Sequence, residues 1–420
     1  MFFPGLFRKS GTGMNSSELS EMIGLTYDTY SGRRVSPQLA MQLTAVFSCV
    51  RVLAESVGML PCSLYEQLDR GNRRAVRERL NKLLSTKPNN YMTPQEFWEL
   101  LIACLCLRGN FYAYKVKALG EVVELLPLEP SSVIPKLNSK WEPEYQVTFP
   151  DGKRDTLTQD DIWHVRIFTL DGLTGLSPIA YAKQAVGLGL ATEEHGSRLF
   201  GNGAVTSGVL QTDQYLKDDA YERLKTDFEN RHQGLANAHK PMILEMGLKW
   251  QQISMTSEDA QFLETRKFQL EEICRIFRVP LHMIQNTDRA TFNNIENLGI
   301  GFINYSLVPY LTRIEQRINV GLVKPSKQGV FYAKFNTGAL LRGDMKSRFD
   351  AYATGINWGI YSPNECRELE ELNPRDGGDI WLTPMNMTTK PESTPEKEEK
   401  QHVDDDKTAA GHTAENKVGH

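Results

Sequence analysis

Residues that could bind a metal or act as nucleophiles are scattered along this chain. Three of the eight histidines lie near its C-terminal end, at His402, His412 and His420. The sequence has no HExxH string and no group of His and Cys residues at the spacing of a zinc site. His164 lies inside the strand-like string IWHVRI, where a hydrogen-bonded core histidine is more frequent than a metal ligand. We therefore expect neither a metal nor a cofactor.

Glycine and carboxylate motifs give equally little support to catalysis. Gly187 and Gly189 resemble the start of a GxGxxG fingerprint, but Thr192 stands at the third position and the surrounding pattern is helical. No lysine follows a glycine loop as in a Walker A motif, and no GxSxG string is present. Asp344 and Asp379 stand in RGD and GGD strings, where a turn or helix cap is the simpler interpretation. We expect that this chain is not an enzyme.

Length and composition are those of an ordinary globular protein. The 420 residues suffice for two or three globular units, with 40% apolar and 24% charged residues. A net charge of −4 provides no bulk positive field, so any contact with nucleic acid must be local or weak. The six cysteines, at positions 49, 62, 104, 106, 274 and 366, include no CxxC pair and are expected to be reduced, buried thiols of a cytosolic protein.

Neither a secretory signal nor a membrane span is expected. The first residues, MFFPGLFRKS, carry their charges after the apolar residues, which is the wrong order for a secretory signal. The longest apolar stretch, around Leu100–Leu107, is far shorter than the roughly 20 residues that cross a bilayer.

The first half of the chain shows the pattern of an α+β protein. One helix is expected from Ser36 and Pro37 to Gly58, and a second begins at a capping box formed by Thr93 and Glu96. Short β-rich strings separated by turn residues predict strands at 111–116, 122–128, 145–149 and 162–167.

The second half contains long helical patterns. A helix rich in small residues should run from Ser177 to about Phe200, and a strand, helix and hairpin module should follow. The next helix should carry Leu263, Leu270, Cys274 and Phe277 inward and pair Glu271 with Arg275. A later pattern, 293–323, contains Pro309 and should kink just before it.

The C-terminal part should hold a strand, a helix near 343–355 and a shorter helix after Ser362 and Pro363. Beyond Thr388 the chain is polar, charged and free of aromatic residues, which predicts a disordered tail.

Eight strings of this sequence, in order between about residues 40 and 385, resemble the portal proteins of tailed bacteriophages with long noncontractile tails. They are SVGMLPCSLYE, PNNYMTPQEFWE, LRGNFYAY, DGLTGLSPI, FGNGAVTSGVL, DAQFLETRKFQLEEICRIFRVP, LLRGDMKSRFDAY and SPNECRELEELNPRDGGD. The resemblance implies the phage portal fold with wing, stem, clip and crown regions, in a ring-forming subunit.

The resemblance also implies a function and partners. About twelve copies would form a ring at one capsid vertex and conduct double-stranded DNA, independent of its sequence, during packaging and ejection. The ring would nucleate procapsid assembly with the major capsid protein, dock the terminase large subunit, and later carry the head-tail adaptor. Its place would be the portal vertex of the virion, and the host cytoplasm during assembly.

The resemblance assigns a region to each part of the chain. The regions are a flexible arm (1–35), the wing (36–173), a stem helix (174–203), the clip (204–256), a second stem helix (257–280), the tunnel loop (281–297), a kinked helix and wing return (298–339), the crown (340–387) and a disordered tail (388–420).

The tunnel loop is expected to face DNA, and its residues have almost no net charge. They are Gln285, Asn286, Thr287, Asp288, Arg289, Asn293 and Asn294. Such a surface touches DNA without gripping it, because each phosphate held by Lys or Arg adds affinity and salt dependence. An ordinary surface loop is the alternative. The expected clip contacts to the motor or adaptor are Lys217, Asp218, Arg223, Lys225, Arg231 and Lys240.

The sequence departs from the family pattern at three positions. Arg278, Leu281 and Gln285 stand where glycine, a second proline and glycine are usual. Arg278 and Arg289 could contact the DNA backbone, or could pair with the glutamates at 271 and 296.

Two other classes of protein remain open. A phage nuclease or head maturation protease would require convergent carboxylates or an activated Ser or Cys, which the motifs do not provide. A different ring-shaped head-tail adaptor is usually much shorter and has no wing-like N-terminal region. Subunit mass and ring appearance would separate these alternatives.

Overall fold

The computed structural model describes residues 26–149, 151–201, 208–211, 218–219, 221–223, 226, 249–252, 257–284, 298–340, 345–370 and 372–382. The chain divides into two compact units, Met1–Arg342 and Gly343–His420. Each unit is described by itself. The predicted tail and most of the predicted arm lie outside the described residues.

The first unit begins with an antiparallel hairpin, β1 (Tyr27–Asp28) and β2 (Arg34–Val35), followed by α2 (Pro37–Ala40) and α3 (Thr44–Gly58). Ser36 caps α2 through its side chain, as its position before Pro37 predicted. The single helix predicted over this stretch is wrong, because Leu43 takes an extended conformation and α3 begins anew at Thr44. This break lets the buried Leu43 side chain pack beside Gly189.

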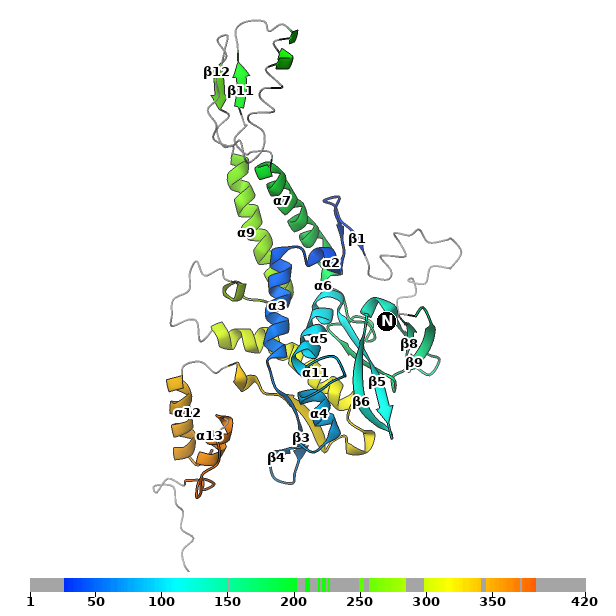
Figure 1. The fold of residues 1–420 in the computed structure, drawn as a ribbon, viewed down its shortest axis with the longest axis vertical. Coiled ribbons are helices and arrows are strands. Elements are labelled where there is room, and N and C mark those ends of the chain that lie inside the picture. The colour runs from blue at the N-terminus through cyan, green and yellow to red at the C-terminus, as the bar shows by residue number, and fades with distance from the viewer. Residues whose placement is uncertain are drawn as a thin grey trace, which may run out of the picture. The chain divides into compact units, whose positions relative to one another are not determined.

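The main core lies where α3 packs against α5 (Pro94–Arg108), with α4 (Arg79–Ser85) nearby (Figure 1). The capping box predicted at Thr93 and Glu96 is present, and Gly109, at φ 75°, ends α5 in the left-handed conformation. Large aromatic side chains fill this core, and Phe97 and Trp163 stack with their ring centroids 6.3 Å apart.

Three of the described antiparallel sheets have three strands each. Their strand orders are β10 (Ile162–Arg166), β5 (Asn110–Ala118), β6 (Glu121–Leu128); β7 (Val133–Leu137), β8 (Pro143–Thr148), β9 (Arg154–Thr158); and β13 (Phe331–Phe335), β3 (Cys62–Gln67), β4 (Asn72–Arg74). The four predicted strands are confirmed as β5, β6, β8 and β10, and the mixture of helices and sheets is α+β as expected.

His164 and the cysteines behave as core residues. The imidazole of His164 is buried, with Nε2 3.1 Å from Asn110 Oδ1, and burial lowers its pKa well below the usual value. All six cysteines are free thiols; five are buried and Cys104 is half-buried. The buried His164 and the five buried thiols match the expectations from sequence, and Cys104 departs from them in being half-buried.

Two helices of the first unit continue past the core. The predicted helix from Ser177 is divided into α6 (Pro178–Tyr181) and α7 (Lys183–Gly201), because Ala182 leaves helical geometry. After the paired strands β11 (Gly208–Gln211) and β12 (Lys249–Gln252) comes α9 (Ser257–Phe277), which ends before the short 3-10 helix η3 (Leu281–Ile284).

The helix that contains Pro309 was predicted to kink just before it, and the structure has a change of helix type at that place. A π-helical turn, η4 (Ile303–Leu307), precedes α11 (Val308–Gly321), and the amide of Val308 donates to the Ile303 carbonyl five residues back. Proline offers no amide hydrogen to the normal helical ladder, so the chain widens at this turn.

The second unit contains α12 (Met345–Asn357) and α13 (Pro363–Leu369), close to the helices predicted there. Ser362 and Glu365 form a capping box at the start of α13. Polar contacts link α12 to the end of α13, because Glu370 accepts from Arg348 Nη2 at 2.9 Å and from the Tyr352 hydroxyl at 2.8 Å. Across both units, the described helices include none that is long and apolar enough to cross a membrane.

Candidate functional site: the helix pair and the base of the predicted tunnel loop

Helices α7 and α9 lie side by side and extend from the core of the first unit, and β11 and β12 lie between them in the chain (Figure 1). These are the helices that the sequence assigned to the stem. The base of α9 is anchored on α3, where Ile273, Cys274 and Phe277 are buried. Leu270 packs against the same core, so the inward positions predicted for 270, 274 and 277 are confirmed, while the Leu263 side chain lies outside the described residues.

Two buried thiols face each other at the anchor of α9. The sulfur atoms of Cys49 on α3 and Cys274 on α9 are 3.8 Å apart. The hydrogen bond to Cys274, together with burial, raises the pKa of Cys49, so this thiol stays protonated. On the exposed side of α9, Arg275 contacts both Glu271 and Glu272, which confirms the predicted pair with Glu271.

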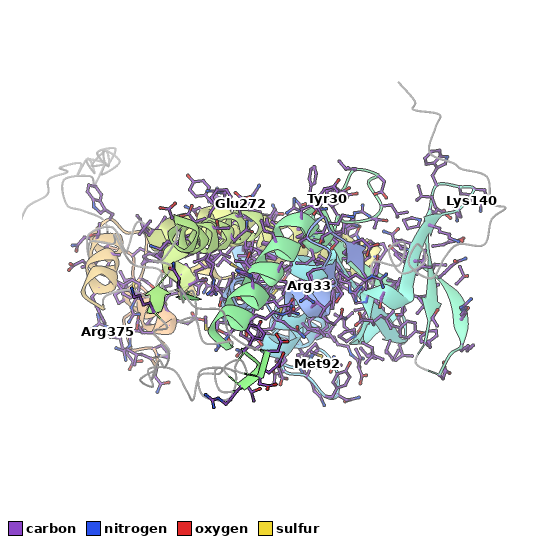
Figure 2. The ribbon with its side chains drawn as sticks, turned by 90° about the horizontal axis from the view of Figure 1, so that it is seen from above. Tyr30, Arg33, Met92, Lys140, Glu272 and Arg375 are labelled. Carbon is purple, nitrogen blue, oxygen red and sulfur yellow. The ribbon has the colours of Figure 1, made fainter. Side chains whose placement is uncertain are left out.

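The N-terminal hairpin holds the base of α7. The guanidinium of Arg33 pairs with Glu194, and the Tyr30 amide donates to Gln184 Oε1 at 2.9 Å. Tyr30 and Arg33 are labelled in Figure 2. Gly187 is needed for this close approach, since a Cβ there would lie 2.7 Å from the Thr29 methyl group. Gly187 therefore serves the packing of α7 against this hairpin.

The chain turns sharply where α9 gives way to the predicted tunnel loop. Arg278 has φ 55°, the left-handed region that favours glycine, and the Val279 amide donates to the Cys274 carbonyl at 3.0 Å. Ser306, which is buried in the π-helical turn, donates its hydroxyl hydrogen to the Arg278 carbonyl. This bond brings the two ends of the predicted loop together.

Only the first residues of the predicted tunnel loop are described. Leu281–Ile284 form η3, and Leu281, Met283 and Ile284 pack against the core, so this part is not a free loop. The seven predicted DNA-facing residues, 285–289, 293 and 294, lie outside the described residues. Of the six predicted clip contacts, Asp218 and Arg223 are described and exposed, and the other four lie outside.

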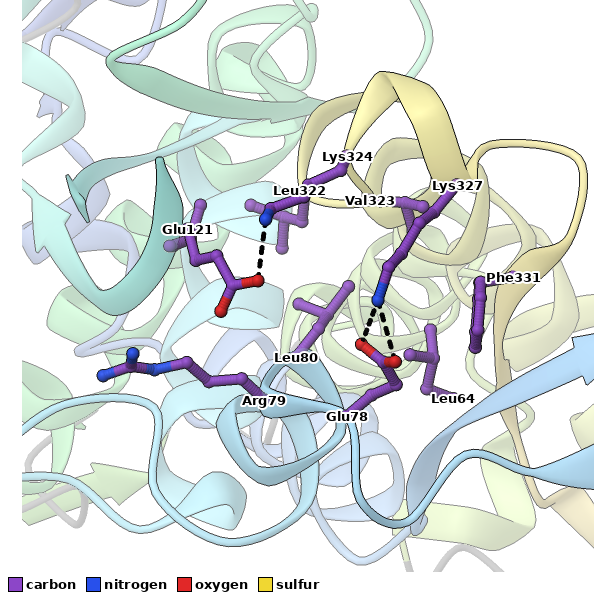
Figure 3. A pocket seen from close by; sticks show the side chains of 11 residues that line it. Leu64, Glu78, Arg79, Leu80, Glu121, Leu322, Val323, Lys324, Lys327 and Phe331 are labelled. Carbon is purple, nitrogen blue, oxygen red and sulfur yellow. Dashed lines mark hydrogen bonds and ion pairs between the residues drawn. The ribbon is translucent and has the colours of Figure 1, made fainter. Parts of the chain in front are cut away.

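The first unit also has a small pocket beside α4, β6 and the segment after α11 (Figure 3). Its carboxylates are both neutralised, because Glu78 pairs with Lys327 at 2.8 Å and Glu121 pairs with Lys324 at 2.7 Å. A cavity of about 40 Å³ has room for water and little else. These pairs tie distant segments together and offer no free acid or base.

Metal ligation finds no support in the part of the chain that the structure describes, where His, Cys, Asp and Glu form no group of three or more suited to an ion. Asp379 acts as a structural acceptor, since Asn364 Nδ2 donates to it at 2.9 Å, and Asp344 lies outside the described residues.

Comparison with known proteins identifies similar sequences over most of the chain. A model of the phage portal protein family matches residues 44–371. The portal protein of Enterobacteria phage HK97 is 32% identical over 355 residues, 83% of this chain and 83% of that protein. The probable portal protein of Streptomyces phage phiC31 is 32% identical over 372 residues, 85% of this chain and 81% of that protein.

Two solved structures with a similar fold come from gene transfer agent particles. A chain in the virion of a native gene transfer agent particle has 26% identity and a TM-score of 0.58, covering 80% of this chain and 92% of that one. A chain in the neck of the native gene transfer agent particle, computed with C12 symmetry, has 27% identity and a TM-score of 0.55, covering 80% of this chain and 93% of that one.

Proposed function

Since this chain belongs to the phage portal protein family, we propose that about twelve copies form a ring at one capsid vertex, through which double-stranded DNA enters during packaging and leaves during ejection. The single observation that carries the proposal is the helix pair α7 and α9, which is anchored on the core. The chain that contains this pair matches most of a chain from a gene transfer agent neck computed with C12 symmetry. No catalytic step is assigned to this chain.

Closure of the ring follows from one repeated contact. In a heterologous interface each copy is related to the next by the same rotation. The copies close into a ring when a whole number of these rotations makes one full turn. The packing of α9 on α3 supports this role, because a fixed angle between stem and wing is needed for every copy to meet its neighbour in the same way.

DNA is expected to pass without being held. The tunnel-loop residues proposed to face it, Gln285–Arg289 with Asn293 and Asn294, offer hydrogen-bonding groups and opposite charges that cancel. A ring of nearly neutral loops releases few counterions from DNA, so affinity stays low and independent of sequence.

The clip is proposed to meet protein partners in turn. Asp218 and Arg223, both exposed, belong to the segment between β11 and β12 that would dock the terminase large subunit and later the head-tail adaptor. The ring would also nucleate procapsid assembly with the major capsid protein. Its places would be the host cytoplasm during assembly and the portal vertex of the virion afterwards.

Electron microscopy and native mass spectrometry of the purified full chain test the proposal. Annular particles of about twelve subunits with a central opening wide enough for duplex DNA are expected. Binding to random duplexes should be weak and should not change with their sequence. A protein that stays monomeric under all assembly conditions, or that binds one sequence tightly, would contradict it.

A further inference from the structure

A groove of about 380 Å³ lies between α11 and the end of β10, away from the helix pair described above. Three of its lining side chains are arginines: Arg166 from β10, and Arg313 and Arg317 from one face of α11. Among the described residues no carboxylate lines this groove. Three positive charges therefore share one concave surface.

The three guanidiniums are poorly compensated. Arg166 donates to the Leu173 carbonyl at 2.9 Å, and Arg313 donates to the Pro309 carbonyl at 3.4 Å. Arg317 has no hydrogen bond or ion pair from its guanidinium within the described part of the chain. Burial and the charge of Arg166 lower the pKa of Arg317, so an anion placed here would relieve an existing cost.

Neighbouring groups hold this arrangement in place. The Trp163 indole donates to the Arg317 backbone carbonyl at 2.9 Å, which fixes the position of α11 against β10. Asp171, in the turn after β10, already accepts from the Thr169 hydroxyl at 2.7 Å and from the amides of Leu173 and Thr174 at 2.8 and 2.7 Å. Its carboxylate is committed to that turn and does not line the groove.

Apolar side chains surround the arginines. Phe168 and Val320 line the groove and are 62% and 63% exposed, and Leu170, two residues after Phe168, is 72% exposed. Arginine and aromatic residues together are typical of the centres of protein interfaces. Duplex DNA would neutralise the charges but would leave these apolar groups facing its phosphates, so the surface favours a protein partner.

We propose that this groove receives a carboxylate side chain, together with apolar residues beside it, from a second copy of the chain in the ring. The inference rests on the proposed ring and adds one of the contacts that build it. A planar carboxylate can accept two hydrogen bonds from one guanidinium, and Phe168 and Val320 would be covered at the same time. Every copy in a closed ring would present the same groove to its neighbour.

Arg317→Glu tests the proposal in the full chain, with Arg70→Glu as the matched control, since Arg70 lies in the exposed turn between β3 and β4. The protein concentration needed for half-maximal ring assembly, followed by native mass spectrometry, should rise at least about tenfold for Arg317→Glu because the charge pair becomes a repulsion. It should change less than about twofold for Arg70→Glu, and Arg317→Lys should recover part of the loss.

A photoreactive p-benzoylphenylalanine in place of Phe168 provides a second readout that does not depend on charge reversal. Irradiation of the assembled protein should give covalent dimers, joined to a peptide that contains Asp or Glu. Circular dichroism reports whether the Arg317→Glu variant still folds. If this variant is unfolded, the cross-link from position 168 in the otherwise unchanged chain tests the proposed contact instead. Cross-linking to DNA alone, or no cross-link, would overturn the proposal.

The outcomes separate this inference from the proposed function. Assembly of Arg317→Glu at the wild-type concentration would overturn the inference and leave the ring intact. A wild-type protein that forms no closed ring, but cross-links into dimers from position 168, would contradict the proposed function and support the contact.

Discussion

The hydroxyl of Ser306 donates a hydrogen bond to the backbone carbonyl of Arg278, and this bond joins the segments that enter and leave the predicted tunnel loop. The two residues are 28 positions apart, so the bond closes the loop at its base. Because Ser306 is 2% exposed, water cannot readily replace it. The two segments that flank the predicted tunnel loop are thereby held together.

Ser306→Ala should lower the free energy of unfolding by about 1–3 kcal/mol, because the Arg278 carbonyl loses its buried donor. Urea unfolding followed by circular dichroism measures the change. Ser131→Ala is the control, since that hydroxyl makes an exposed contact with Glu129 only two residues away. Equal effects of the two variants would show that the loop base contributes nothing.

Substitutions at Arg278 should rank by their tolerance of the left-handed conformation. Arg278 is exposed and has φ 55°, so replacing it by glycine removes a backbone strain of about 1–2 kcal/mol from the folded protein. Part of this gain is lost, because glycine raises the conformational entropy of the unfolded chain. Arg278→Gly should be neutral or more stable by up to about 1 kcal/mol, whereas Arg278→Val should be less stable by at least about 1 kcal/mol. Thermal unfolding measures both, and a reversed order would contradict the explanation.

Local signals in the sequence were sufficient for many elements. The capping boxes at Thr93 and Ser362 lie next to their helices, and alternating strings between turn residues indicate β5, β6, β8 and β10. The departure from the family pattern at Arg278 was also visible in the sequence. The structure explains why glycine is usual at this position, since the backbone there takes the left-handed conformation for which glycine is suited.

Features that depend on distant residues could not be predicted. Strand β3 pairs with β13, so that Cys62 lies opposite Phe335, although most of the chain separates these two residues. The break at Leu43 depends on packing beside Gly189, which no local pattern contains. In the candidate site, the helices were predicted, but the bond from Ser306 to Arg278 was not, and the residues proposed to face DNA remain predictions.

The glycines of α7 should differ in their tolerance of alanine. A Cβ at Gly187 would lie 2.7 Å from Thr29 Cγ2 and 3.0 Å from Thr29 Cβ, so the hairpin β1–β2 would have to move. A Cβ at Gly189 would meet Leu43 Cδ2 at 2.9 Å, which is the end of a side chain that can turn. The helix gains about 1 kcal/mol from either change.

Gly187→Ala should therefore lower stability by about 1–2 kcal/mol, and Gly189→Ala should change it by less than about 1 kcal/mol. Thermal unfolding of the two variants side by side provides the comparison. If Gly187→Ala proves as stable as Gly189→Ala, the hairpin does not hold α7 as described.

Lys115 should make stability depend on pH in the alkaline range. Its ammonium is buried on β5 and donates to the carbonyls of Gln159 at 2.9 Å and Gly321 at 3.1 Å, where it ties the end of α11 to the sheet. Burial lowers the pKa of Lys115 from 10.5 to about 8. Between these values the unfolded chain binds more protons than the folded one, so the contribution of Lys115 to stability rises as the pH increases from 8 to 10.5, by up to about 3 kcal/mol.

Lys115→Met removes both hydrogen bonds and this titration. The loss of stability relative to the wild type should thus be larger at pH 10 than at pH 7, since the wild type is relieved of its buried charge only at the higher pH. Urea unfolding at a series of pH values measures the difference, and Lys136→Met, at an exposed position, corrects for general effects of removing a lysine. A loss that is constant with pH would mean that Lys115 keeps its ordinary pKa in the folded protein, and that its charge is not desolvated at the end of α11.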